Sequence, residues 1–460
     1  MNKDKDFLGT EPVGKLMFRL ALPTITAQLI NMLYNIIDRI YIGHIPGNGA
    51  LALTGVGVCM PLIMIISAFA ALVGGGGAPH ASIAMGKNDL NTAEHILGNC
   101  FFLQILISII LTVILLFGNR TFLLAFGASE NTIEYAVNYM NIYAVGTIFV
   151  QLTLGMNMFI TTQGFAKTGM LSVLIGAVMN IVLDPLFIFA FHLGVRGAAL
   201  ATILSQAVSC IWVLSFLCGK KTILHIRKKN LILKPEIILP CVALGLATFI
   251  MQASESIISV CFNSSLLKYG GDIAVGAMTI LTSVMQFAML PLQGLGQGAQ
   301  PVLSYNYGAR RPSRVKNSGI VMALMVFGYT AIMWSLIILA PGMLIRIFSS
   351  DSVLVADAIP ALKLYFAAFI FQALQYIGQT FFKSLNKKKQ AIFFSLLRKV
   401  FIVVPLTYLM PYTLHMGTAG VFLAEPVSNV IGGSFCFITM LCTVLPELKR
   451  MGQDNAAVGR

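Results

Sequence analysis

Long apolar runs separated by short polar segments fill most of the chain. The runs approach or exceed 20 residues, which is the length that a helix needs to cross the hydrocarbon core of a bilayer. The pattern predicts twelve spans, at roughly 16–42, 51–76, 95–118, 132–155, 168–190, 195–218, 237–263, 273–298, 317–342, 358–382, 390–412 and 416–445. They lack the short alternating pattern typical of membrane barrel strands. We therefore expect an all-α integral membrane protein with twelve transmembrane helices.

A basic segment divides these spans into two sets of six. The predicted organisation is an N-lobe at 1–218 with helices 1–6, a cytoplasmic basic connector at 219–236 and a C-lobe at 237–460 with helices 7–12. A shift of 222 residues places Gly74, Gly76, Pro79, Ser82 and Gly86 on Gly296, Gly298, Pro301, Ser304 and Gly308. Such self-similarity indicates an internal duplication. Each set has an even number of crossings, so the two lobes are expected to be pseudo-symmetric parallel repeats that flank a central cavity.

Composition and charge support a membrane protein rather than a soluble one. Hydrophobic residues make up 57% of the chain and charged residues only 10%, against about 25% charged in soluble domains. The net charge of +14 arises from 31 Lys and Arg residues, most of which fall in alternate loops. By the positive-inside rule, both termini are predicted to be cytoplasmic. The basic excess needs no partner beyond membrane lipids, and no nucleic-acid binding is expected.

A polar stripe on the first predicted helix ends in an acid. Gln28, Asn31, Asn35 and Asp38 recur at spacings of three, four and three, which places them on one helical face. A charged side chain in a membrane helix costs roughly 2.5–3.5 kcal/mol on insertion scales, so Asp38 is expected to face protein or water. This makes Asp38 a candidate for ion coupling. The alternative is that it pairs with Arg39 or caps the outer end of the helix.

A second acid lies on the fifth predicted helix. Asn180 and Asp184 stand four residues apart on one face, and Pro185 follows directly. Because proline interrupts the helical hydrogen bonds, the carbonyl of Ile181 is expected to be free beside the carboxylate. These oxygens could hold a proton or a small cation, with a hydroxyl from Thr202 on the sixth helix. The alternative is a kinked helix whose acid is satisfied by a neighbour.

Further polar faces predict a water-accessible cavity. In the second half, Gln252 and Glu255 share a face of the seventh helix, and glutamines line the eighth and tenth helices. The candidate substrate-cavity residues are Gln28, Asn31, Tyr34, Asn35, Gln252, Glu255, Gln286, Gln372 and Gln375. Hydrogen bonds between helices are an equally good explanation for any single glutamine. Arg398 and Lys399 are expected to line the inner mouth or to extend their charges toward the interface.

Several segments together resemble the multidrug and toxin extrusion (MATE) family, and within it the DinF-type bacterial branch. They are PTITAQLINMLYNIIDRIYIGHI, GGGGAPHASIAMGKND, its second-half counterpart GLGQGAQPVLSYNYGARRPSR, MNIVLDPLFIF and FQALQYIGQTFFKSLNKKKQA with the following SLLRK. The resemblance covers nearly the whole chain. It implies two six-helix lobes, a bacterial inner-membrane location and drug efflux driven by H⁺ or Na⁺.

The resemblance also implies a cation site in the N-lobe. Its residues would be Asp38, Asn180, Asp184 and Thr202, with H⁺ or a monovalent cation as coupling ion and no other cofactor. Glu255 fits an acid that some branches use in the C-lobe, but the tenth helix offers only glutamines, so a second coupling site there is in doubt.

The sequence therefore predicts a cation-coupled antiporter that exports amphipathic, mostly cationic compounds by alternating access and that functions as a monomer. A lipid-linked oligosaccharide flippase of the same superfamily is the first alternative, although such a protein is expected to have a more basic cavity. A polytopic membrane enzyme is the second. No Walker A, HExxH or GxSxG motif supports it, so the chain is expected not to be an enzyme.

Overall fold

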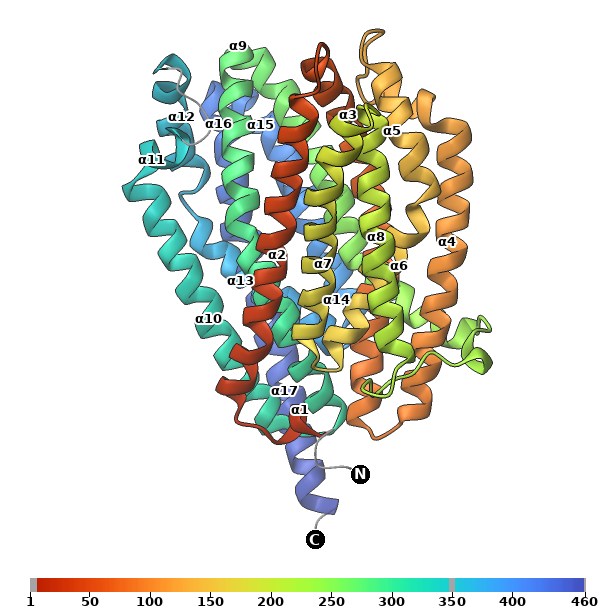
Figure 1. Ribbon diagram of the computed structural model, residues 1–460. Helices are drawn as coiled ribbons and strands as arrows, with labels where there is room; N and C mark the ends of the chain where they lie inside the picture. Colours follow the sequence, from red (N-terminus) through yellow and green to blue (C-terminus); the bar gives the residue numbers. More distant parts are fainter. Residues whose placement is uncertain (1–5, 347–351, 459–460) are drawn as a thin grey trace. The chain divides into compact units, whose positions relative to one another are not determined.

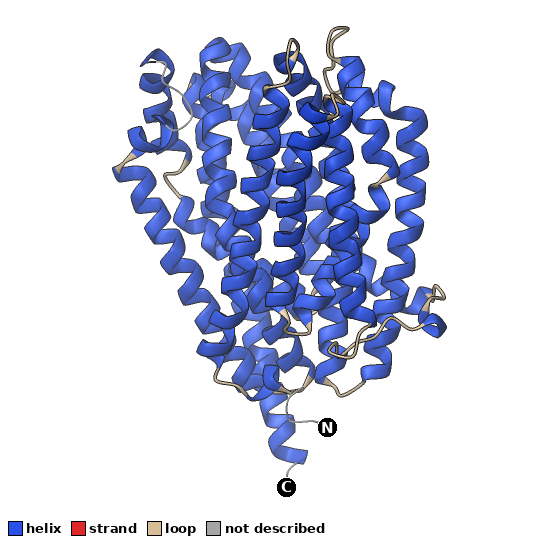
Figure 2. Ribbon diagram, viewed as in Figure 1, coloured by secondary structure: helices blue, strands red, loops and turns tan. Residues whose placement is uncertain are grey.

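The computed structural model describes residues 6–346 and 352–458. Helices and loops make up these ranges, and no strand occurs in them (Figure 2). The predicted all-α fold is confirmed. The chain divides into two compact units: unit 1 comprises Met1–Leu8 and Arg19–Phe249, and unit 2 comprises Gly9–Phe18 and Ile250–Arg460. This division differs in detail from the predicted lobes, because the start of the first long helix belongs to unit 2.

The first half of the chain is a series of long helices (Figure 1). They are α1 (Phe7–Thr10), α2 (Val13–Gly43), α3 (Gly49–Gly86), α4 (Leu90–Ala125), α5 (Ile133–Val145), α6 (Thr147–Thr162), α7 (Ala166–Pro185), the π-helical turn η2 (Leu186–Ala190) and α8 (Val195–Cys218). In unit 1, α3 packs against α4, α5 and α6, and α8 packs against α5, α6 and α7. This packing surrounds α3 with neighbours, as its many buried small residues require.

The second half repeats this type of succession with more breaks. After η3 (Lys228–Asn230) come α9 (Pro235–Gly308), α10 (Pro312–Leu339), α11 (Pro341–Arg346), α12 (Ser352–Tyr365), α13 (Phe369–Ser384), α14 (Lys388–Leu396), η4 (Leu397–Val403), α15 (Val404–Thr413), α16 (Gly417–Ser428), η5 (Asn429–Gly433) and α17 (Ser434–Val458). In unit 2, α13 packs against α10, α14, α17 and η5. A central position of α13 in this unit explains why its glutamines are buried.

The number of membrane spans agrees with the sequence. Among the described residues, 10 helices are long and apolar enough to cross a membrane, and the number rises to 12 if each of two bent pairs is one span. The bends are 58° between α5 and α6 and 48° between α12 and α13. α9 is two helices joined at Gly271, whose φ of 64° is accessible to glycine at little cost. The two bent pairs occupy corresponding places in the halves, as expected for repeats.

The basic segment after α8 is held against unit 1 by buried polar side chains. Gln163 Oε1 accepts hydrogen bonds from the backbone N–H groups of Ile223 and Leu224, each at 2.8 Å. Glu94 Oε2 lies 2.9 Å from Arg227 Nε, so one positive charge of this segment is neutralised within the protein. The segment is therefore an ordered part of unit 1 rather than a free tether.

Two glycines allow close contact between α3 and the start of α9 within unit 1. A Cβ at Gly76 would lie 1.8 Å from the Cys241 carbonyl oxygen, and one at Gly245 would lie 1.7 Å from the Leu72 carbonyl oxygen. Small residues of this kind let membrane helices approach to backbone contact.

Candidate functional site

Two carboxyl groups meet in the interior of unit 1. Asp38 lies near the end of α2 and Asp184 in the last turn of α7, and their side chains share a hydrogen bond. Asp38 is 9% exposed and Asp184 is fully buried. Two ionised carboxylates only accept hydrogen bonds, so the shared bond requires a proton on one of them. The pair is thus built to hold one proton between two acids.

The alternative in which Asp38 pairs with its neighbour Arg39 does not describe the contacts in the structure, although the two charges interact electrostatically. Arg39 is exposed, and among the described residues no ion pair joins it to Asp38. Asp38 lies one turn before Ile42, which is part of an apolar cluster drawn from α2, α3, α4, α5, α6, α8 and η2. Burial beside this cluster keeps the acid in a medium of low polarity, where proton sharing is favoured over two separate charges.

Asn180 lies one turn before Asp184 on α7 and forms a hydrogen bond with it. Its Nδ2 donates a hydrogen bond to Asp184 Oδ1 at 3.2 Å, and its side chain is 2% exposed. Pro185 ends α7, and the chain continues as the π-helical turn η2. Such turns occur frequently at functional sites because they redirect the backbone within a helix.

Apart from the hydrogen bond between the two acids, three buried oxygens of this group have no hydrogen-bond partner. They are Asp38 Oδ1, Asn180 Oδ1 and Asp184 Oδ2. Buried acceptors are normally satisfied, so an unpaired set from three neighbouring side chains makes this group a candidate ion site. Carboxylate and amide oxygens suit a proton or a small hard cation. The donor set therefore fits the coupling ions that the sequence suggested.

Thr202 lies near this site but is linked to it through a tyrosine. Its Oγ1 donates to the Ala198 carbonyl oxygen at 3.0 Å, and it shares a hydrogen bond with Tyr139. Tyr139 is 3% exposed and interacts electrostatically with Asp38. The sequence reasoning did not identify Tyr139. The recurrence of Tyr135, Tyr139 and Tyr143 at intervals of four on α5 was the available signal.

The other polar side chains of this part of α2 differ in how directly they interact with the acid pair. Tyr34 interacts electrostatically with both Asp38 and Asp184 and hydrogen-bonds with Asn35. Asn35 Nδ2 also donates to the Asn31 carbonyl oxygen at 2.6 Å. Gln28 and Asn31 are partly exposed, and Asn35 is exposed. Tyr34, which precedes the stripe residue Asn35, is therefore the α2 side chain that interacts most directly with both acids.

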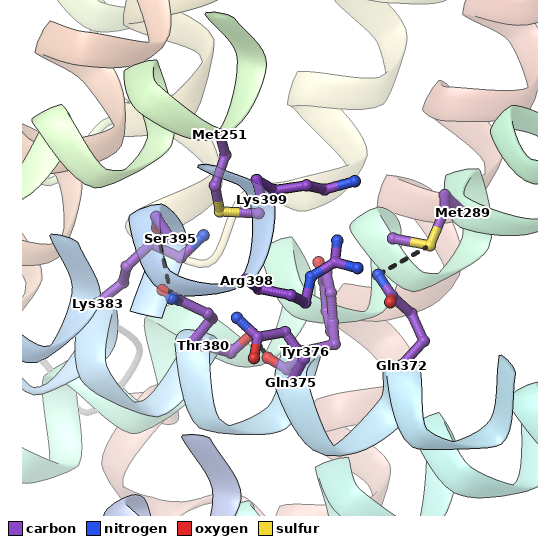
Figure 3. Close-up of a pocket in the computed structure, with 11 residues that line it drawn as sticks. Met251, Met289, Gln372, Gln375, Tyr376, Thr380, Lys383, Ser395, Arg398 and Lys399 are labelled. Atoms are coloured by element: carbon purple, nitrogen blue, oxygen red, sulfur yellow. Dashed lines mark hydrogen bonds between the residues drawn. The ribbon is translucent and has the colours of Figure 1, made fainter. Parts of the chain in front are cut away.

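In unit 2, the structure brings together some of the predicted cavity residues. Gln372 and Gln375 line a pocket with basic side chains from η4 (Figure 3). Glu255 is joined to this pocket through Lys399, whose Nζ lies 2.9 Å from Glu255 Oε1. Gln252 and Gln286 are exposed, and neither is among the lining residues.

Arg398 and Lys399 line the pocket of unit 2 and do not extend their charges toward the interface, so the second of the two expected placements is wrong. They are 4% and 7% exposed. Arg398 Nη1 lies 2.8 Å from Glu425 Oε1 and donates to Asn429 Oδ1 at 2.7 Å. A charge buried in a membrane protein must be paired in this way. Glu255 and Glu425 of unit 2 are therefore matched by cations, whereas Asp38 and Asp184 of unit 1 are matched by each other.

A family model described as MatE matches residues 23–186 and 247–409. The two segments cover well over half of the chain and are offset by nearly the shift found in the sequence, which supports the duplication. The chain belongs to the MatE family. The resemblance inferred from the sequence is thereby confirmed.

Known proteins of this family match the chain over nearly its full length. The "Multidrug export protein MepA" of Staphylococcus haemolyticus is 22% identical over 446 residues, which are 97% of this chain and 96% of that protein. A solved structure described as an outward-facing multidrug resistance MATE family transporter of the MOP superfamily has a TM-score of 0.90 at 23% identity, covering 98% of this chain and 99% of that one.

A second solved structure, of a MATE protein in complex with MaD3S, also has a TM-score of 0.90, at 22% identity and with 98% and 100% of the two chains covered. These likenesses confirm the predicted fold. This MatE protein is a multi-pass membrane protein and, as its relatives are named export proteins and transporters, a transporter rather than an enzyme.

Proposed function

We propose that this MatE protein is a cation-coupled antiporter that exports amphipathic, mostly cationic compounds by alternating access. The observation that carries the proposal is the hydrogen bond shared by Asp38 and Asp184. Names of full-length relatives, such as the multidrug export protein MepA of Staphylococcus haemolyticus, support export of drugs as the activity.

Coupling follows from competition for the acid pair. An H⁺ or Na⁺ that enters from outside neutralises Asp38 and Asp184, and the neutral pair packs differently from the charged one. If the compound to be exported prefers the state with the charged pair, each ligand weakens binding of the other. Exchange of the ion for the compound then needs no other coupling element. Asn180 holds Asp184 in place, and Thr202 orients Tyr139 beside Asp38.

The same proposal includes an orientation in the membrane. Lys and Arg residues concentrate in the terminal segments, the 219–236 segment and alternate loops, which supports cytoplasmic termini in a bacterial inner membrane. The chain contributes both units by itself, which supports a monomer as the working form. Membrane lipids are the expected surroundings, and no nucleic-acid partner is proposed.

The test is ethidium efflux from vesicles that contain the purified protein, under imposed Na⁺ or pH gradients. Asp38→Asn and Asp184→Asn should each abolish gradient-driven efflux, while Glu134→Gln should leave it unchanged. Glu134 is a matched control because it is an acid in an exposed ion pair with Arg120. The gradient that drives efflux identifies the coupling ion. Normal efflux by properly inserted Asp38→Asn and Asp184→Asn proteins would refute the mechanism.

One observation favours the flippase alternative. Lys383, Arg398 and Lys399 line the pocket in unit 2, and a basic cavity is what a phosphate-bearing lipid substrate requires. Transport of a fluorescent lipid-linked sugar phosphate by the same vesicles, without dye efflux, would favour the flippase over the drug exporter.

A further inference from the structure

A pocket in unit 2 combines positive charge, amide groups and apolar surface. Its walls come from α9, α13, α14 and η4 (Figure 3). The lining residues are Met251, Met289, Gln372, Gln375, Tyr376, Gln379, Thr380, Lys383, Ser395, Arg398 and Lys399. All of them belong to unit 2. The acid pair of unit 1 is thus a separate feature.

The cations of this pocket outnumber the carboxylates available to them. Glu425 Oε1 lies 2.8 Å from Arg398 Nη1 and 3.6 Å from Lys399 Nζ, so one carboxylate serves two cations. Glu255 also contacts Lys399, but the Glu255 side chain is 56% exposed, so its charge is screened more strongly by its surroundings.

Lys383 increases this imbalance. It lies at the end of α13 and lines the pocket, and within the described part of the chain no ion pair involves it. Uncompensated positive charge in an environment of low polarity attracts an anion strongly. The arrangement therefore leaves one position for an acidic group beside Lys383.

Three glutamines add unfilled hydrogen-bond acceptors to the same pocket. Gln372, Gln375 and Gln379 are 6%, 5% and 2% exposed, and the Oε1 atom of each is buried without a hydrogen-bond partner. The amides of Gln375 and Gln379 point their nitrogens at carbonyl oxygens of α14, Phe394 at 3.4 Å and Ala391 at 3.1 Å. Their oxygens are thus left for donors on a ligand.

The apolar part of the pocket defines the rest of the ligand. Met251 and Met289 lie on α9, with Met289 Sδ accepting a long contact from Gln372 Nε2 at 3.8 Å, and Tyr376 adds an aromatic ring. Methionine side chains adapt to differently shaped apolar ligands. The pocket itself, at about 30 Å³, has room for the acid group of a ligand, with apolar and aromatic side chains at its border.

We propose that this pocket binds the carboxylate or phosphate group of an amphipathic compound, with Lys383 as the main charge partner and the glutamine oxygens as acceptors for neighbouring donors. The inference rests on the proposed export function and refines it, because it adds zwitterionic and acidic amphipathic compounds to the expected cations. The anion can belong to a free compound or to a lipid headgroup, and the two sources are distinguished by experiment.

The test compares two dyes that differ only in the acid. Rhodamine B has a free carboxylate, and its ethyl ester has the same cationic ring system without it. Binding of each dye to the purified full chain in phosphatidylcholine nanodiscs is measured by fluorescence polarisation. Lys383→Gln should weaken binding of rhodamine B by about tenfold, the effect of losing one charged hydrogen bond, and should leave the ester within about twofold.

Two further variants make the result specific. Lys383→Arg keeps the charge and should retain binding of rhodamine B. Lys389→Gln removes an exposed lysine on α14 that does not line the pocket, and it should change neither dye. If Lys383→Gln weakens the binding of both dyes equally, or the binding of neither, the proposed anion site is wrong. Because no gradient is imposed, this failure is distinct from a failure of coupled transport.

A second set of measurements, in a different lipid, identifies the source of the anion. The same measurement is repeated in nanodiscs that contain phosphatidylglycerol. If the anionic lipid displaces rhodamine B from the wild-type chain and from Lys389→Gln, a headgroup occupies the pocket. If rhodamine B binds equally in both lipids, with dependence on Lys383, the pocket recognises free acidic compounds. Both outcomes support an anion site.

Discussion

Arg398 and Glu425 form an ion pair inside unit 2, with Arg398 Nη1 2.8 Å from Glu425 Oε1 and the two side chains 5% and 3% exposed. Glu425→Gln leaves Arg398 buried without a carboxylate. We expect it to lower the free energy of unfolding by about 3 kcal/mol. The double variant Arg398→Met with Glu425→Leu removes both charges and should recover most of this loss. Unfolding by SDS in mixed micelles measures the difference.

An exposed ion pair provides the comparison. Arg120 Nη1 and Glu134 Oε1 are also 2.8 Å apart, but their side chains are 60% and 66% exposed. Glu134→Gln should therefore cost less than about 1 kcal/mol. Equal losses from Glu134→Gln and Glu425→Gln would mean that burial does not determine the strength of the pair in unit 2.

Asn180 is expected to support transport rather than folding. Asn180→Leu removes the donor to Asp184 Oδ1 and should slow gradient-driven ethidium efflux by roughly tenfold, because a hydrogen bond to a charged group contributes about 1.5–3 kcal/mol. Asn138→Leu is the control, since Asn138 Oδ1 accepts hydrogen bonds from Arg196 away from the acids. Efflux that falls equally in both variants would contradict a special role for Asn180.

Gly76 should tolerate no side chain. Gly76→Ala forces a methyl group to within 1.8 Å of the Cys241 carbonyl oxygen, whereas Gly57, on the same helix α3, has no atom within 4 Å of an added Cβ. We expect Gly76→Ala to lower the free energy of unfolding by about 1–3 kcal/mol, as overpacking does. Gly57→Ala should be neutral or slightly stabilising. The thermal unfolding temperatures in detergent compare the two, and similar values would disprove close packing at Gly76.

Asp89, in the loop before α4, should give a pH-dependent contribution. Its Oδ1 accepts a hydrogen bond from the Thr92 backbone N–H at 2.9 Å, and hydrogen bonds from Thr92 lower the pKa of the Asp89 carboxyl. A lowered folded-state pKa gives stability that is present above the unfolded pKa of about 3.9 and is lost as the pH falls through the folded value.

Asp89→Ala should accordingly speed hydrogen exchange in the first turn of α4 at neutral pH, by an amount that corresponds to about 1 kcal/mol for a lost N-cap. The difference from the wild-type chain should shrink as the pH is lowered toward 3, while Asp89→Asn should retain most of the protection. A difference that is independent of pH would mean that the charge of Asp89 has no part in the cap.

The sequence predicted the spans and the acid site where a periodic signal was present. Spacings of three and four placed Asp38 on one helical face and Asn180 with Asp184 on another, and Pro185 marked the break that became η2. That these residues share one site was implied by the family resemblance, because helical spacing does not indicate which helices contact one another. The spacing of four residues between Tyr135, Tyr139 and Tyr143 did not single out Tyr139, because tyrosines at helical spacing equally describe a packed core.

The pocket in unit 2 was harder to predict. The span boundary at 382 assigned Lys383 to a loop, but α13 continues to Ser384 and carries Lys383 into the pocket wall. Arg398 was placed correctly in a span, yet its partner Glu425 is 27 residues away on another helix. Neither hydropathy nor spacing indicates which helix a buried charge will contact.

The bends at Gly146 and Ala368 were also not predicted, because no proline marks them in the sequence.

The helix α2 begins in one unit and ends in the other. Residues Gly9–Phe18 belong to unit 2, where Arg311 and Arg314 donate to the carbonyl oxygens of Gly9 and Glu11, and the helix from Arg19 onward belongs to unit 1 and carries Asp38. Pro23 lies in the unit 1 part of the helix, four residues after its start at Arg19, and weakens the backbone ladder there. If protonation of Asp38 displaces α2, the displacement acts on residues of both units, because one continuous helix without an intervening loop contributes to each of them.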